Sequence, residues 1–318
     1  MEIRDFLKIM VERDASDIYL TVESPPMYRI NGVTQPVGDG KLTNEQLQAL
    51  ANAVMRTDKQ RKEFEETMEM NLALAYEDLG RFRVNIFRQR GNVGFVIRQI
   101  KVEIVPLDKL GLPPIIKDIS LTKRGLVLVV GATGSGKSTT LAAMIDHHNS
   151  NEPGHIISVA DPIEFVHRHK KSIVSQREIG FDTHSYANAL KNTLRQAPDV
   201  ILIGEVRDTE TMEAAITFAE TGHLCLGTLH SNNSNQAIER IMNFFPHERH
   251  AQIYLQLSLN LRAIISQRLI PSVDGKRVAA LEVLLDTPHI KDLIKRGEVD
   301  VLKDAMEQGI QEGGETHE

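Results

Sequence analysis

LVLVVGATGSGKSTT, residues 126–140, is the stretch of this chain that decides its fold. Five β-favouring aliphatic residues end at Gly131, the spacing G-x-x-x-x-G-K-[ST] runs through Ser138, and a helix-compatible segment follows. Inward-facing backbone N–H groups at a helix N-terminus bind phosphate, and glycine is needed where φ is positive or a Cβ would collide. A chance glycine-rich turn would lack the flanking strand and helix, so the stretch predicts a nucleoside triphosphate site.

The predicted phosphate-binding residues are the loop and the start of the helix after it. The three loop glycines let the backbone approach the phosphates, Lys137 supplies the cation, and the Ser138 hydroxyl is suited to Mg²⁺. ATP and Mg²⁺ are therefore the predicted cofactors. The full set is Gly131, Ala132, Thr133, Gly134, Ser135, Gly136, Lys137, Ser138 and Thr139.

Composition indicates an ordinary globular protein. The length of 318 residues suggests about two domains, with 41% hydrophobic and 25% charged residues. The net charge of −6, the 5% aromatic content and the lack of Trp give no reason to expect nucleic acid as a partner. No apolar run approaches a membrane span of ~18 residues, and the acidic, amphipathic start does not resemble a signal peptide. Cys225 is the single cysteine and lies in an apolar run, which predicts a buried thiol and a cytoplasmic protein.

The pattern of elements divides the chain into three parts. Residues 1–100 mix helices with short alternating strands, including a hairpin at Asn31-Gly32 and a helix over Leu47 to Met70. Residues 101–120 contain a proline-bearing stretch that predicts a linker. Residues 121–318 alternate β and α, which predicts an α/β domain with a mostly parallel sheet and helices on both faces.

Two strands after the glycine-rich loop end in carboxylates, where a parallel sheet places its hydrolytic groups. DVILIGE ends at Glu205, with Gly204 at the position where an Asp would hold the Mg²⁺ shell. Glu205 would orient or deprotonate the attacking water, or hold the metal, unless it is only an exposed residue at a strand exit. HIISVAD ends at Asp161, followed by Pro162 and Glu164, and predicts a second acidic group beside the phosphates.

Two histidines flank the next strand, His223 before it and His230 after it. His230 lies at the carboxyl end of the strand, where it would hydrogen-bond the γ-phosphate. A single histidine is more often structural, so that alternative stays open for both. No third ligand is spaced to make them a metal site.

Basic residues of the N-terminal part form a separate group. Arg81 and Arg83 alternate on one strand, and Arg98 lies on its partner. A solvated sheet face is the ordinary explanation. A phosphoryl-transfer site also needs a cation, however, and another domain or subunit can supply it.

Four motifs in order resemble a known family: GATGSGKSTT (131–140), DPIEFVH (161–167), TLRQAPDVILIGEVRDTETM (193–212) and FAETGHLCLGTLHSNNSNQAIERIMNFFP (218–246). They look like the type IV pilus retraction ATPases, the PilT/PilU family of the secretion ATPase superfamily. The third and fourth are closer to its PilU branch. The resemblance covers nearly the whole chain.

The resemblance implies a PAS-like α+β N-terminal domain and a RecA-like P-loop ATPase domain, assembled as a homo-hexamer with ATP between the two domains of a subunit. It implies pilus retraction for twitching motility, with a paralogous retraction ATPase and the inner-membrane platform protein as partners. The resemblance also implies that the protein is a peripheral protein on the cytoplasmic face of the inner membrane, at the pilus base.

The resemblance also assigns residues to roles. Gly131 to Ser138 is the Walker A loop and Glu205 the Walker B glutamate. Asp161 and Glu164 lie in an acidic box, and His223 and His230 in a histidine box. Arg83 and Arg98 match arginines that reach the γ-phosphate.

Two features depart from the family pattern. The acidic box begins with Glu-Asp-Pro in the family, whereas Ala160 precedes Asp161 here. A methyl group cannot polarise water, so hydrolysis could be slow or lost, through an engineered or a natural change. In the family, further helical sequence follows the part that matches Val301 to Gln311. We therefore expect this chain to be truncated.

Three functions follow as hypotheses. The first is an ATP-driven retraction motor, and the second is an ATP-binding accessory ring with little hydrolysis of its own, which Ala160 favours. The third is a RecA-like nucleic-acid translocase, which the acidic balance and scarce aromatics disfavour.

Overall fold

The computed structural model describes residues 2–100, 103–272 and 277–311. The chain divides into two compact units, within Met1–Val102 and Glu103–Glu318. Of the predicted linker, residues 101–102 lie outside the described part. Leu107, Ile116 and Ile119 are buried in the core of the second unit, so the later residues of that stretch pack with this unit.

The first unit is α+β, with a six-stranded sheet in the order β3-β2-β1-β6-β5-β4 whose neighbouring pairs are all antiparallel. Alternate residues of β4 are buried, as expected when only one face of a sheet packs on a core. Its elements are α1 (Ile3–Glu12), β1 (Ala15–Leu20), β2 (Met27–Ile30), β3 (Val33–Pro36), α2 (Asn44–Val54), α3 (Asp58–Thr67), β4 (Glu69–Tyr76), β5 (Gly80–Gln89) and β6 (Asn92–Ile100).

The predicted hairpin at Asn31-Gly32 is confirmed, because both residues have positive φ between β2 and β3. The prediction of one helix over Leu47 to Met70 is wrong. The chain ends α2 at Val54 and begins α3 after Thr57, whose side chain accepts a hydrogen bond from the Gln60 backbone. This capping box starts a new helix and so breaks the helical pattern into two.

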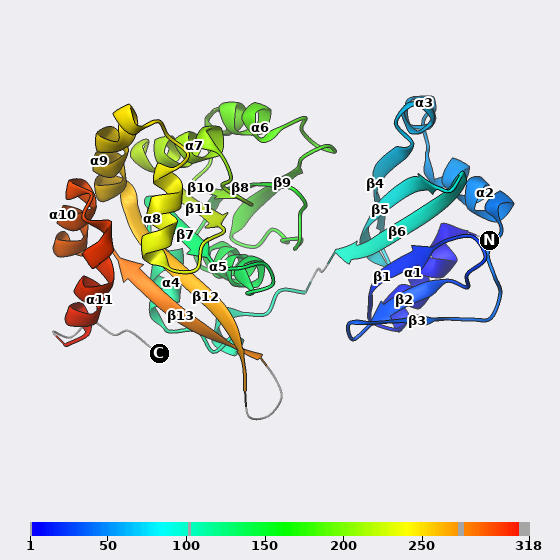
Figure 1. Cartoon of the computed structure of the whole chain (residues 1–318), viewed down its shortest axis with the longest axis horizontal. Coiled ribbons are helices and arrows are strands. Elements are labelled where there is room, and N and C mark those ends of the chain that lie inside the picture. Colours follow the sequence, from blue (N-terminus) through cyan, green and yellow to red (C-terminus); the bar gives the residue numbers. More distant parts are fainter. Residues whose placement is uncertain (1, 101–102, 273–276, 312–318) are drawn as a thin grey trace. The chain divides into compact units, whose positions relative to one another are not determined.

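The second unit contains a seven-stranded sheet in the order β13-β12-β7-β11-β10-β8-β9. All neighbouring pairs are parallel except β12 with β13. The predicted α/β fold with a mostly parallel sheet is therefore confirmed (Figure 1). The strands are β7 (Gly125–Val130), β8 (Gly154–Ala160), β9 (Ser172–Glu178), β10 (Val200–Ile203), β11 (Leu224–Leu229), β12 (Leu261–Pro271) and β13 (Arg277–Leu285).

Helices cover both faces of this sheet. Leu126 and Leu128 of β7 belong to one buried cluster and Val127 and Val129 to another, so the strand that precedes the glycine-rich loop is buried on both sides. The helices are α4 (Ile115–Ser120), α5 (Lys137–Asn151), α6 (Tyr186–Thr193), α7 (Thr209–Glu220), α8 (Ser234–Met242), α9 (His250–Asn260), α10 (Pro288–Arg296) and α11 (Leu302–Gln311), with short 3₁₀ turns at Leu107–Lys109, Leu194–Gln196, His247–Arg249 and Val299–Val301.

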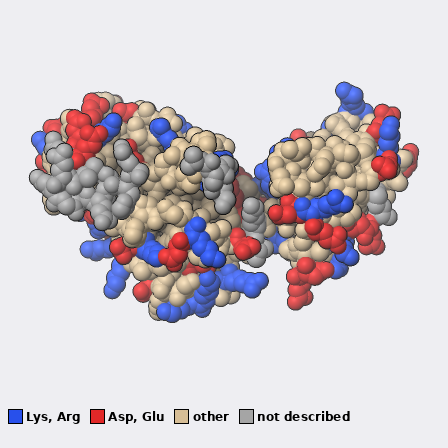
Figure 2. Space-filling view, turned by 90° about the horizontal axis from the view of Figure 1, so that it is seen from below, with Lys and Arg blue, Asp and Glu red and all other residues tan. Residues whose placement is uncertain are grey.

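Two surface properties follow from the described residues. On the face in Figure 2, basic and acidic side chains are interspersed over both units, so this face presents charges of both signs. None of the helices placed by the structure has the length and apolar character needed to cross a bilayer.

Candidate nucleotide-binding site

The glycine-rich loop connects the last residue of β7, Val130, to the first residue of α5, Lys137. Gly131, Gly134 and Gly136 have φ values of +155°, +78° and +88°, a region that L side chains rarely adopt. A Cβ on Gly131 would also lie 2.4 Å from the main-chain oxygen of Gln267. The loop conformation therefore depends on glycine for both backbone angle and space.

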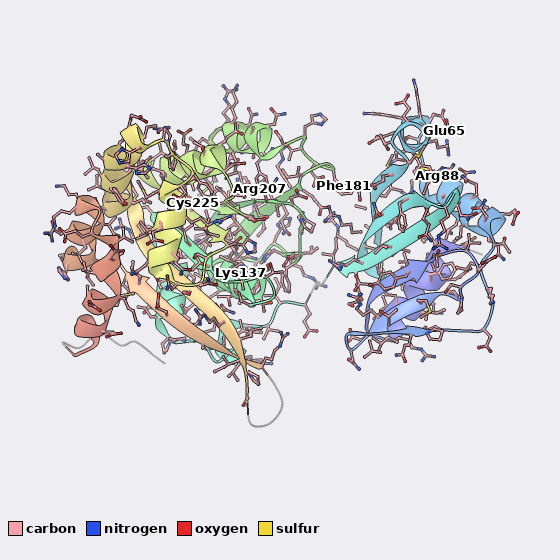
Figure 3. The ribbon with its side chains drawn as sticks, in the orientation of Figure 1. Glu65, Arg88, Lys137, Phe181, Arg207 and Cys225 are labelled. Carbon is pink, nitrogen blue, oxygen red and sulfur yellow. The ribbon has the colours of Figure 1, made fainter. Side chains whose placement is uncertain are left out.

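Lys137 is 8% exposed and its ammonium is bound to the loop itself. Its Nζ donates to the carbonyl oxygens of Gly131 and Ala132, at 2.8 and 2.9 Å. Burial lowers the pKa of Lys137, and the nearby carboxylates of Glu205 and Glu164 oppose that shift. Lys137 is labelled in Figure 3. A bound phosphate would bring a stronger acceptor to its ammonium.

A cavity of about 240 Å³ lies beside the loop, and residues at strand exits contribute to its polar lining. The acidic residues that follow β8 and β10, and the histidine that follows β11, all line it. These strands are parallel neighbours, so their carboxyl ends meet at one edge of the sheet. The predicted residues that the structure brings together here are Thr133, Gly134, Lys137, Ser138, Asp161, Glu164, Glu205 and His230.

Glu205 and His230 form a pair at this edge. His230 Nε2 lies 3.4 Å from Glu205 Oε1, and both side chains are about two-fifths exposed to solvent. Thr228, two residues before His230, donates its hydroxyl hydrogen bond to the carbonyl of Gly204 at 2.5 Å. The exits of β10 and β11 are thus joined directly beside the two side chains.

Asp161 contacts a residue that the sequence did not predict. Arg207 Nη2 lies 3.8 Å from Asp161 Oδ2, and the guanidinium sits 5.3 Å from the ring centroid of Tyr186. Burial, reinforced by the charge of Asp161, raises the pKa of Tyr186 to about 12. Arg207 places a positive charge beside the acidic groups of the cavity.

Ala160 also lines the cavity, at the last position of β8. A Cβ built on Gly204 would lie 3.0 Å from the Ala160 Cα and 3.1 Å from its Cβ. The two strand exits therefore approach closely at this point. Position 160 therefore lies next to Gly204, the residue that precedes Glu205.

The structure separates the two predicted histidines. His223 precedes β11, whereas His230 follows it, so the strand lies between them. The His223 ring lies 3.0 Å from the Thr221 hydroxyl and 3.2 Å from the Phe218 carbonyl, at the end of α7. It does not line the cavity, because it lies at the amino end of a strand whose carboxyl end forms the site.

The predicted arginines lie on the sheet of the first unit. Arg83 on β5 is paired directly opposite Arg98 on β6, and Arg98 opposite Asp17 on β1. Arg98 Nε donates to Asp17 Oδ1 at 2.8 Å, and Asp17 is only 2% exposed. Arg98 thus has a structural partner within its own unit.

Sequence reasoning missed Gln267, which is 3% exposed on β12. Its amide contacts Ser135 of the loop and Thr140 of α5. Strand β12 itself carries a signal in LRAIISQRLI, where the three polar residues Ser266 to Arg268 interrupt an apolar run. That signal does not reveal which distant segment the polar residues contact.

The cavity residues fit Mg²⁺ as an ion that arrives with the nucleotide. Ser138 and Glu205 both line the cavity and offer a hydroxyl and a carboxylate oxygen. In the part of the chain that the structure describes, no group of three His, Cys, Asp or Glu side chains is arranged to hold a metal alone. Mg²⁺ commonly keeps waters and takes one or two protein ligands together with phosphate oxygens.

The family model described as type II/IV secretion system protein matches residues 2–308. The chain belongs to this family. Type IV pilus ATPase PilU of Pseudomonas aeruginosa is 54% identical over 99% of this chain and 83% of its own length. Type IV pilus retractation ATPase PilT of the same species is 43% identical over 99% of this chain and 92% of its own.

Solved structures agree with this assignment to the secretion family of ATPases. The crystal structure of the pilus retraction motor PilT with bound ADP superposes with a TM-score of 0.91, at 44% identity, over 97% of this chain and 90% of that one. The Legionella pneumophila ATPase DotB gives a TM-score of 0.83 at 27% identity, over 98% of this chain and 88% of that one. The similarity includes both units of this family member.

Proposed function

We propose that the protein is an ATP-hydrolysing motor that retracts type IV pili and so powers twitching motility. The observation that carries this proposal is the single cavity in which the glycine-rich loop, Glu205 and His230 meet. The full-length similarity to two pilus ATPases supplies the biological context.

Each group has a chemical task in this proposal. The loop N–H groups and Lys137 bind the phosphates, and Ser138 with Glu205 holds the Mg²⁺ that the nucleotide brings. Glu205 orients or deprotonates the attacking water, and His230, 3.4 Å away, hydrogen-bonds the γ-phosphate. Asp161 and Glu164 extend the acidic side of the cavity.

The proposal includes an assembly. Six copies form a ring at the cytoplasmic face of the inner membrane, docked to the pilus platform protein and working with a paralogous retraction ATPase. Arg83 and Arg98 of the first unit, and His223, act at subunit or domain boundaries of the ring. Such an arrangement would supply the cation that phosphoryl transfer requires.

A second function rests on Ala160. The methyl group at the exit of β8 faces the cavity and offers no oxygen to water or metal. A chain that binds ATP but hydrolyses it slowly would act as an accessory ring beside an active motor.

Phosphate release from the full chain and from Ala160→Glu separates the two functions. Lys137→Ala supplies the background rate. A parent rate well above that background supports the motor. A parent at background whose activity returns in Ala160→Glu, by about 10²-fold as for a restored acid–base group, supports the accessory ring. If the parent and Ala160→Glu both stay at the background rate, the motor is refuted, and the missing glutamate at position 160 does not explain the absent hydrolysis.

A further inference from the structure

Gln267 lies on β12 beside the start of the glycine-rich loop. Strand β12 runs parallel to β7, and Ser266 is paired with Val130, the residue just before the loop. Both ends of the Gln267 amide are bonded in the interior: Nε2 donates to the carbonyl of Ser135 at 2.9 Å, and Oε1 accepts from the hydroxyl of Thr140 at 2.7 Å. One side chain thus joins the loop to the first turn of α5.

The bond to Ser135 fixes the direction of a loop N–H group. The peptide unit between Ser135 and Gly136 is planar and trans, so the carbonyl of one and the N–H of the other point in opposite directions. With the Ser135 carbonyl held by Gln267, the Gly136 N–H points away from Gln267. Loop N–H groups of this kind bind phosphate, so their orientation before binding sets affinity.

The neighbours of Gln267 hold a second loop. Ser266 Oγ and Arg268 Nη2 both donate to the carbonyl of Asn232, at 3.1 and 3.3 Å. Alternate residues of a strand point to opposite faces, which explains how three consecutive residues contact two loops. Asn232 lies two residues after His230, the partner of Glu205.

We propose that Gln267 is a positioning residue that holds the phosphate-binding loop ready for nucleotide, and that Ser266 does the same for the loop that carries His230. The inference rests on the proposed function, because it concerns the same nucleotide site. It predicts separate effects: Gln267 affects the Kd for nucleotide, and Ser266 affects kcat for ATP hydrolysis.

ADP titration calorimetry on the full chain tests the role of Gln267. Gln267→Leu should raise the Kd for ADP about tenfold, the effect of one ordinary hydrogen bond. It also leaves the buried Thr140 hydroxyl unpaired, so the melting temperature should fall. The double variant Gln267→Leu with Thr140→Val removes that hydroxyl and should recover part of the melting temperature, while the Kd for ADP stays high because the Ser135 carbonyl still lacks its donor.

Two further variants complete the experiment. Gln256→Leu removes the exposed hydrogen bond to Glu220 on α7 and should leave both Kd and turnover unchanged. Ser266→Ala should lower kcat for ATP hydrolysis several-fold at an unchanged Kd for ADP.

The outcomes distinguish this inference from the proposed function. A parent-like Kd in Gln267→Leu, or a Kd that recovers together with the melting temperature in the double variant, overturns the positioning role and leaves the ATPase proposal standing. A parent that binds neither ADP nor ATP overturns both.

Discussion

His167 shows how strongly burial acts on a single residue beside the cavity. The side chain lines the cavity, is 7% exposed, and its Nδ1 has no hydrogen-bond partner among the described residues. Burial lowers the pKa of His167 to about 4, although the charge of Asp146 opposes the shift. The ring is therefore neutral in the folded protein throughout the physiological range.

The lowered pKa of His167 predicts that the free energy of unfolding falls in mild acid. The unfolded chain binds a proton at His167 near pH 6.5 and the folded chain only near pH 4, so stability rises with pH in this window. The contribution of neutral His167 to the free energy of unfolding is complete above pH 6.5 and is lost as pH falls toward 4. Between pH 7.5 and 5 it amounts to about 2 kcal/mol.

Urea unfolding at pH 7.5 and pH 5 measures this loss as a shift in midpoint. His167→Leu should reduce the shift, because the buried titrating group is gone. His184→Leu, at an exposed position, should leave the shift as it is in the parent. An equal shift in the parent and in His167→Leu would assign the acid sensitivity to other groups.

At the scale of elements, the site depends on how closely two strand exits approach. Gly204 follows β10 and Ala160 ends β8, and a Cβ on Gly204 would press on the Ala160 backbone at 3.0 Å. The φ of Gly204 is not in the left-handed region, so glycine is needed here for space. This explains why a glycine occupies the position before Glu205.

Gly204→Ala should therefore displace the exit of β10 and with it Glu205. We expect a destabilisation of about 1–3 kcal/mol, as for other overpacked positions, and a fall in phosphate release at saturating ATP. Gly40→Ala is the matched control, because a Cβ there meets open space at an unstrained φ. A melting temperature and an activity equal to those of the parent in Gly204→Ala would show that β8 and β10 accommodate the added methyl group without loss of stability.

The same elements show what the sequence can predict. The loop from Gly131 and the carboxylates that end β8 and β10 follow from local patterns, a strand followed by glycine or by an acid. Gln267 contacts Ser135 across 132 residues of chain, and no local pattern encodes such a contact. Likewise, Arg207 reaches Asp161 only because β8 and β10 are neighbours in the sheet.

At the scale of the whole molecule, the first unit carries a row of charges across its sheet. Arg29, Asp17, Arg98 and Arg83 are paired in succession on four adjacent strands and so share one face. Arg29 Nη1 lies 3.8 Å from Asp17 Oδ2, and Arg98 approaches the same carboxylate from the other side. Arg98 therefore has a structural role within its own unit, in addition to any contact with a phosphate.

Arg83→Ala should spare ADP binding but weaken the binding of a non-hydrolysable ATP analogue about tenfold, if this residue contacts the γ-phosphate in the ring. Calorimetric titration with each nucleotide measures the difference. Arg98→Ala serves as a comparison, because it should also lower the melting temperature by removing the basic partner that donates to the buried Asp17 carboxylate. An equal loss of ADP and analogue affinity in Arg83→Ala would exclude a role in sensing the terminal phosphate.

Cys225 lies fully buried in β11, as its apolar surroundings in the sequence predict, and burial raises the pKa of its thiol. The one native sulfhydryl is thus shielded from maleimide dyes while the fold is intact. Two cysteines introduced at exposed positions, one in each unit, would become the sole attachment points for a donor and an acceptor fluorophore. Energy transfer between them could then follow the two units through successive turnovers without any native residue being removed first.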